Sequence, residues 1–130
     1  MFHILAGEYG ERAAQYRQLA YDVPHDGCAM GSWRIITPLS SRRFAYRFPE
    51  GLDCTYAFLE FGERARERDE ETTVGVRRWL VERLRSRTYG VMFDDDRAAV
   101  VGKGRPTERN DEVVRRIEAL ERKPAAPAAP

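Results

Sequence analysis

The most regular pattern in the chain is a two-residue alternation of aromatic and other side chains, which is typical of β-strands. It runs over 43–48, where Phe44, Tyr46 and Phe48 fall on one side. Residues 54–61 (CTYAFLEF) are rich in β-favouring side chains and predict a second strand. Only a short Pro- and Gly-containing connection separates the two, whereas a parallel crossover needs about a dozen residues. We therefore expect these strands to pair as an antiparallel hairpin.

Three segments repeat apolar residues every three or four positions, which is the spacing of a buried helix face. The clearest helix is predicted over 72–87, with a stripe of Val76, Leu80 and Leu84. A last helix begins at Asn110 or Asp111, and its apolar face is Val113, Val114, Ile117 and Leu120. A first helix is predicted over 8–20, with a face of Tyr9, Ala13, Tyr16 and Ala20.

Shorter β-favouring runs complete the predicted elements. They indicate strands over 1–6, 33–37, 91–93 and 98–101. The stretch 22–31 contains Pro24, Gly27 and Gly31 and is interpreted as a loop, and Asp94 to Asp96 as a solvated turn. The order of elements predicts an α+β fold with a ferredoxin-like βαββαβ antiparallel sheet and an added C-terminal helix. A parallel, three-layered sheet is the alternative, which the short connection after residue 48 disfavours.

Composition indicates one small domain. The chain has 130 residues, of which 42% are hydrophobic and 33% charged, so a core lies beneath a heavily charged surface. We predict a single α+β domain over 1–123 and a disordered Pro/Ala tail over 124–130. No apolar run is long enough for a membrane span, and the N-terminus lacks the pattern of a secretory signal, so a cytoplasmic location is expected. We expect Cys28 and Cys54, the only cysteines, to be reduced and buried.

Charge becomes informative only through its position in the chain. The whole sequence carries a formal net charge of +1, which favours no class of partner. Residues 27–49, however, contain no acidic residue and hold Arg34, Arg42, Arg43 and Arg47, a local charge of +4. Aromatic residues are interleaved with these arginines. Guanidinium groups beside aromatic rings are typical of a groove that binds single-stranded nucleic acid.

The strand over 54–61 carries the best candidate site. Its two-residue period places Tyr56 and Phe58 on one face and Ala57, Leu59 and Phe61 on the other. If the second face packs on the helices, Tyr56 and Phe58 form an open platform on which bases can stack. Residues 56–61 (YAFLEF) also resemble the last six positions of the RNP1 motif of RNA-recognition-motif domains, although Cys54 and Thr55 replace its initial Lys or Arg and Gly. The resemblance implies a βαββαβ fold and base stacking by Tyr56 and Phe58.

These observations favour a small non-enzymatic module that binds RNA or single-stranded nucleic acid. Tyr56 and Phe58 would stack on bases, and Arg43 and Arg47 would contact phosphates. The alternative is a protein-interaction or assembly module that uses the same aromatic face for a dimer or another partner. A further alternative is a small nucleotide-binding enzyme that holds phosphate at 102–105 (GKGR). No residue is assigned a catalytic or metal-binding role, and no cofactor is expected.

Overall fold

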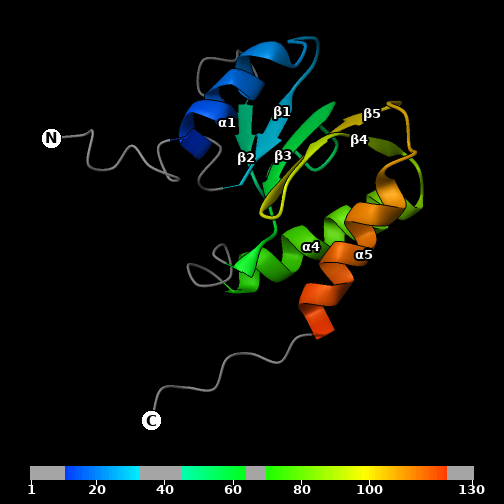
Figure 1. Ribbon diagram of the computed structural model, residues 1–130. Coiled ribbons are helices and arrows are strands. Elements are labelled where there is room, and N and C mark those ends of the chain that lie inside the picture. The colour runs from blue at the N-terminus through cyan, green and yellow to red at the C-terminus, as the bar shows by residue number, and fades with distance from the viewer. Residues whose placement is uncertain (1–10, 33–44, 64–69, 123–130) are drawn as a thin grey trace, which may run out of the picture.

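The computed structural model describes residues 11–32, 45–63 and 70–122 (Figure 1). Its elements in chain order are α1 (Glu11–Asp22), β1 (Ala29–Gly31), β2 (Ala45–Arg47), β3 (Tyr56–Glu60), α4 (Glu70–Arg85), β4 (Tyr89–Asp94), β5 (Ala98–Lys103) and α5 (Asn110–Arg122). The strands predicted over 1–6 and 33–37 and the tail over 124–130 lie outside the described residues.

The strands form a five-stranded mixed sheet in the order β2-β1-β3-β5-β4. β1 runs parallel to both β2 and β3, whereas β3 and β4 each run antiparallel to β5, which lies between them. The protein is α+β, but the prediction of a ferredoxin-like βαββαβ antiparallel sheet is wrong, because half of this sheet is parallel and its order differs.

The predicted hairpin between β2 and β3 is also wrong, since these strands do not pair with each other. Both flank β1, where Met30 lies opposite Tyr46 on one side and Ala57 on the other. β2 and β3 both run parallel to β1 and lie on opposite sides of it, so the chain crosses β1 between them. Because β2 has only three residues, a short connection is long enough for this crossing. β1 itself falls within the stretch interpreted as a loop.

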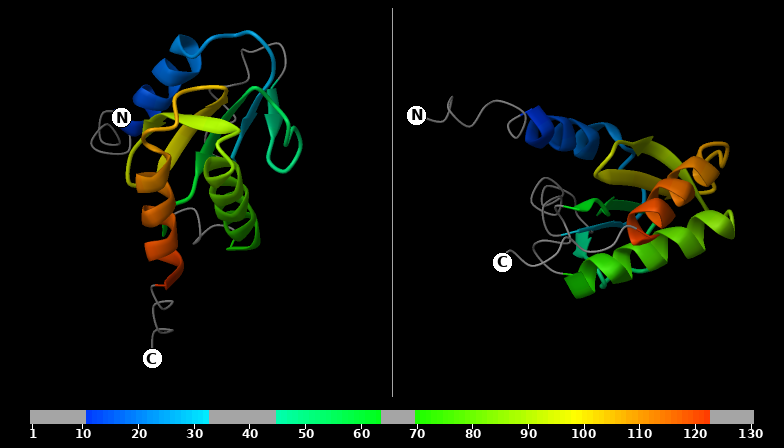
Figure 2. Two further views of the ribbon diagram at one scale, coloured as in Figure 1. Left: turned by 90° about the vertical axis from the view of Figure 1, so that its right-hand side faces the viewer. Right: turned by 60° about the horizontal axis from the view of Figure 1, so that its bottom comes forward.

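Helices cover both faces of the sheet, which gives three layers (Figure 2). α1 packs against one face through a cluster of Tyr16, Ala20, Val23, Ala29, Tyr56, Phe58, Ala98 and Val100. α4 and α5 cover the opposite face with the apolar stripes predicted for them, whose buried members are Val76, Leu80, Leu84, Val113, Val114 and Ile117. β3 is therefore covered on both sides, and all five of its residues are buried.

Candidate functional site

The structure places Tyr56 and Phe58 in the interior rather than on an open face. Each side chain is 1% exposed, within the cluster beneath α1. Arg47 lies on the same face of the sheet, because Gly31 pairs with both Arg47 and Phe58, and it is exposed at the edge. Arg43 lies outside the described residues. Tyr56 and Phe58 thus do not form an open surface on which bases can stack.

The Tyr56 hydroxyl belongs to a polar cluster at the start of β3. It donates a hydrogen bond to Asp26 Oδ1 at 2.7 Å and accepts one from Arg105 Nη2 at 3.0 Å. The Arg105 guanidinium also lies 5.7 Å from the centroid of the Tyr56 ring. Burial, assisted by the Asp26 carboxylate, raises the pKa of Tyr56, while Arg105 acts in the opposite direction. The phenol is therefore held neutral and links the loop before β1 to the loop after β5.

The proposed phosphate loop over 102–105 has little free hydrogen-bonding capacity. The backbone amides of Lys103, Gly104 and Arg105 donate to the carbonyl oxygens of Thr55, Thr88 and Gly102, respectively. The Lys103 ammonium donates to the Asp53 carbonyl oxygen at 2.6 Å, and Pro106 has no amide hydrogen. An anion has no set of free backbone donors to bind in this loop, so the nucleotide-binding alternative gains no support from its geometry.

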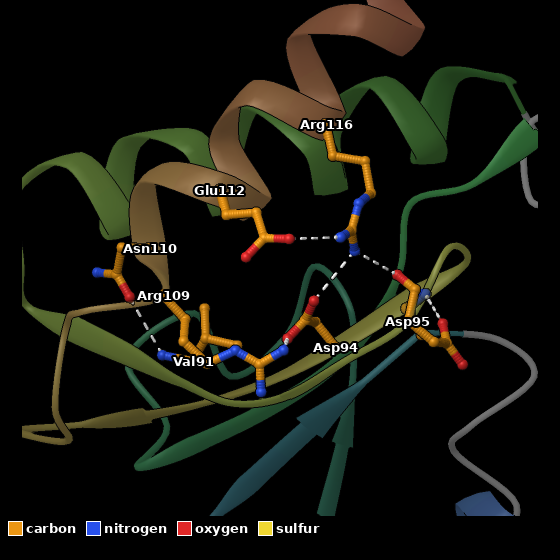
Figure 3. A network of polar contacts seen from close by, with 8 residues as sticks. Val91, Asp94, Asp95, Arg109, Asn110, Glu112 and Arg116 are labelled. Carbon is orange, nitrogen blue, oxygen red and sulfur yellow. Dashed lines mark hydrogen bonds and ion pairs between the residues drawn. The ribbon is translucent and has the colours of Figure 1, made fainter.

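The acidic turn after β4 is part of a structural network (Figure 3). Asp94 has a 3% exposed side chain and pairs with Arg109 and with Arg116, whose Nη1 is 3.0 Å from Asp94 Oδ2. Arg116 Nη1 also donates to the Asp95 carbonyl oxygen. The interpretation of Asp94 as a solvated turn residue is therefore wrong: its carboxylate holds the β4–β5 hairpin against α5.

Asn110 closes the outer edge of β4. Its Oδ1 accepts a hydrogen bond from the Val91 amide at 3.2 Å, and its Nδ2 donates to the Tyr89 carbonyl oxygen at 2.9 Å (Figure 3 shows the contact with Val91). These are the two groups that a residue of an added strand would bind. The same Nδ2 also donates to the Leu84 carbonyl oxygen. The buried amide thus satisfies these two backbone groups of β4 and removes a place where another strand could pair.

β2, at the opposite edge of the strands in the described ranges, has a different surface. Tyr46 is 39% exposed, Leu52 in the following connection is 40% exposed, and Arg47 is also exposed. Because Tyr46 pairs with Met30, its side chain is on the α4 side of the sheet, whereas Arg47 is on the α1 side. We call Tyr46, Arg47 and Leu52 the β2 surface. It joins an aromatic ring, an aliphatic side chain and a guanidinium at a strand edge.

A disulfide between Cys28 and Cys54 joins the residue before β1 to the connection that follows β2. The prediction that both cysteines are reduced is wrong, because the loops before β1 and β3 bring them together. Gly51, which has a φ of +78°, packs between the disulfide and the β2 surface. A Cβ at Gly51 would lie 2.8 Å from Tyr46 Cβ and 3.0 Å from Cys54 Sγ, so a larger residue would displace one of them.

The described residues do not support a metal site or a membrane-spanning helix. Within 11–32, 45–63 and 70–122, no three His, Cys, Asp or Glu side chains cluster in a way that could hold a metal ion. None of the helices in those ranges combines the length and apolar character needed to cross a membrane. Arg77, although 1% exposed, is tied to the protein itself: its Nε donates to the Phe61 carbonyl oxygen, and its Nη1 is 3.3 Å from Glu121 Oε2.

Comparisons with protein-family models, with curated proteins and with solved structures gave no match to this chain. The resemblance of residues 56–61 to RNP1 stays a prediction.

Sequence reasoning missed the main features of the β2 surface. It grouped Tyr46 with Phe44 and Phe48 on one side of a hairpin strand and did not show that Tyr46 is 39% exposed in an edge strand of the described sheet. The acid-free stretch over 27–49 was the available signal, since it contains both β1 and β2. No spacing rule could have paired Cys28 with Cys54, because their contact depends on two parallel strands lying side by side.

Proposed function

We propose that this chain is a protein-interaction module that binds an extended, acidic segment of a partner protein along β2. The carrying observation is the contrast between the two edges of the sheet. β4 is closed by the Asn110 side chain, whereas β2 presents Tyr46 and Arg47 to solvent. β2 lies at the edge of the described strands, and an edge strand is a template for strand addition, in which backbone hydrogen bonds supply affinity and alternate side chains supply specificity.

The side chains of β2 indicate what such a segment contains. An added strand also alternates its side chains between the two faces of the sheet. On the α1 face it would meet the Arg47 guanidinium, which favours a carboxylate. On the α4 face it would meet the Tyr46 ring, which favours an apolar side chain. A segment that alternates acidic and apolar residues fits both faces.

Charge argues for a different protein rather than a second copy as the partner. Pairing β2 with β2 of another copy would bring together two acid-free stretches, each with a charge of +4. Like charges across paired strands are destabilising. An acidic partner gains attraction from the same stretch, and its association rate increases through long-range steering.

This proposal replaces stacking on nucleic acid as the function of the sheet. The nucleic-acid prediction required accessible Tyr56 and Phe58 rings, and both side chains are buried beneath α1. The protein-interaction alternative changes too, since the surface it uses is the β2 edge and not the covered aromatic face. The cytoplasmic location expected from the sequence remains part of the proposal.

Fluorescence anisotropy of a short labelled peptide that alternates Glu and Val tests the proposal. We expect saturable binding that weakens as the salt concentration rises, because ions screen the contact with the basic stretch. Arg47→Glu should weaken binding about tenfold, which is about 1.4 kcal/mol. The matched control is Arg115→Glu, which reverses an exposed arginine on α5 and should leave affinity unchanged.

Two further probes define the mode of binding. A peptide with Lys in place of Glu should not bind, and N-methylation at alternate residues of the Glu–Val peptide should prevent binding by blocking backbone pairing. If the N-methylated peptide binds as well as the original, the contact is not strand addition. If a single-stranded RNA oligonucleotide binds more tightly than the peptide and Arg47→Glu abolishes that binding, the module recognises nucleic acid instead.

A further inference from the structure

We infer that the Cys28–Cys54 disulfide regulates the β2 surface, so that the oxidised chain binds its partner and the reduced chain binds weakly. This inference rests on the proposed function, and it concerns regulation of the same site. It starts from the position of the disulfide, which joins the residue directly before β1 to the connection between β2 and β3.

The disulfide fixes the connection that leaves β2. That connection turns back twice, with the Glu50 amide donating to the Arg47 carbonyl oxygen at 2.8 Å and the Cys54 amide to the Gly51 carbonyl oxygen at 3.0 Å. At its far end Cys54 is buried and bonded to Cys28, which directly precedes the neighbouring strand β1. The connection is therefore held at β2 by backbone pairing and at β3 by the sulfur–sulfur bond.

Gly51 transmits the position of Cys54 to the binding surface. The space that a Cβ would occupy at Gly51 is limited on one side by Tyr46 Cβ and on the other by Cys54 Sγ. Gly51 thus lies between Tyr46 and Cys54, with no room for a side chain of its own. When Cys54 is no longer held by Cys28, Gly51 loses the support that keeps it against the Tyr46 side chain.

Reduction is chemically accessible from one side. Cys28 is partly exposed whereas Cys54 is 2% exposed, so the thiolate of a dithiol reductant reaches Cys28 Sγ first. The bond between the two protein sulfurs breaks, Cys54 leaves as a thiolate and takes up a proton, and Cys28 forms a mixed disulfide with the reductant. The second thiol of the reductant then releases Cys28 as a thiol and becomes oxidised to a disulfide. In the cytoplasm, such bonds are usually transient and redox-sensing.

The size of the effect follows from the population of the binding-competent arrangement. If the reduced connection keeps Tyr46 and Leu52 in place about a tenth of the time, the apparent Kd of the Glu–Val peptide rises about tenfold. The oxidised protein holds this arrangement continuously and shows the intrinsic affinity.

The experiment measures peptide binding by the full chain before and after treatment with dithiothreitol, with free thiols counted in each sample. We expect about tenfold weaker binding after reduction. The double variant Cys28→Ser with Cys54→Ser should bind weakly with or without reductant. Equal affinity of the oxidised and reduced chains overturns the inference while leaving the proposed function intact, as does failure of the two thiols to form a disulfide under oxidising conditions.

Amide hydrogen exchange over residues 46–54 gives a readout that does not depend on the peptide. Exchange there should accelerate on reduction, with β4 and β5 unchanged. If neither form binds the peptide, the proposed function fails, and the exchange data alone decide the coupling: acceleration supports it, and unchanged exchange overturns it.

Substitution of Gly51 tests the contact route itself. Gly51→Ala introduces a Cβ between Tyr46 and Cys54 and should weaken binding by the oxidised chain about as much as reduction does. Gly104→Ala is the matched control, because Gly104 also has a positive φ, of +71°, but a Cβ added there would have no neighbouring atom within 4 Å. Equal loss of binding in both variants overturns the route through Gly51.

Discussion

At the scale of single residues, Tyr56 illustrates how a side chain with a functional appearance can be structural. In the sequence it is an aromatic residue on a regular strand, with an arginine-rich stretch nearby. In the structure its ring contributes to the cluster beneath α1, and its hydroxyl joins Asp26 to Arg105. The two-residue period of the strand correctly placed Tyr56 and Phe58 on one face of the sheet and Ala57 and Leu59 on the other. It could not show that a helix covers each face.

The raised pKa of Tyr56 predicts how stability depends on pH. The unfolded chain ionises this phenol near the ordinary pKa of 10.0, whereas the folded chain resists ionisation because of burial and the Asp26 carboxylate. The stability that the neutral Tyr56 phenol gives the folded chain is therefore complete below about pH 10. It is lost as the pH rises through the folded-state pKa. Tyr89, whose pKa is raised by burial and by Asp53, contributes with the same sign.

Urea unfolding of the wild type and of Tyr56→Phe tests this prediction. At neutral pH the variant should be about 1 kcal/mol less stable, since it loses the hydrogen bonds to Asp26 and Arg105. That difference should shrink as the pH rises above about 10, where the unfolded phenol ionises. Tyr21→Phe removes a hydroxyl from a residue that is 78% exposed and serves as the control. A stability difference that stays constant over this range would contradict the assigned burial of the Tyr56 phenol.

At the scale of elements, the apolar periodicity identified α4 and α5 well, because each helix buries one continuous stripe. Strands were harder to predict. β1 has three residues, Ala29 to Gly31, and is stabilised by its position between two other strands rather than by its own composition. The hairpin prediction failed for the same reason: connection length limits which strands can be neighbours, but it does not reveal a third strand between them.

Asn110 provides a test of how the β4 edge is closed. The sequence indicated it only as a possible start of the last helix, whereas its amide binds the backbone of Val91, Tyr89 and Leu84. Asn110→Ala should destabilise the protein by about 2–4 kcal/mol, because it leaves buried backbone groups without partners. Asp111→Ala, at the next and exposed position, should change stability by less than about 0.5 kcal/mol.

Thermal or urea unfolding measures both variants, and hydrogen exchange locates the change. Faster exchange of the Val91 amide in Asn110→Ala is the expected sign of an opened edge. An Asn110→Ala variant with wild-type stability would show that the β4 edge does not depend on this side chain.

At the scale of the whole molecule, the sheet order and the disulfide are linked. Parallel pairing of β1 with β3 brings Cys28 and Cys54 together across a sequence separation of 26 residues. Neither feature could be derived from local pattern, since both depend on contacts between distant segments. The acid-free stretch over 27–49 was visible in the sequence, but the place of Arg47 at one edge of the described strands was not.

Reduction of the disulfide should lower the stability of the whole domain. Closing a loop of this length removes chain entropy from the unfolded state, which corresponds to about 3.5 kcal/mol. We therefore expect the free energy of unfolding in urea to fall by about this amount in dithiothreitol. The double variant Cys28→Ser with Cys54→Ser should not respond to the reductant. A wild type whose stability is unaffected by reduction would show that the bond does not constrain the chain.

The central claim is that β2 accepts an extended acidic segment, and mapping backbone amide resonances during titration with the Glu–Val peptide tests it most directly. The account predicts chemical-shift changes and slowed hydrogen exchange concentrated over Ala45 to Leu52, with β4 unaffected because Asn110 already occupies its edge. Both changes should disappear in Arg47→Glu. Changes concentrated on α1 or on β4, with Ala45 to Arg47 unaltered, would contradict it.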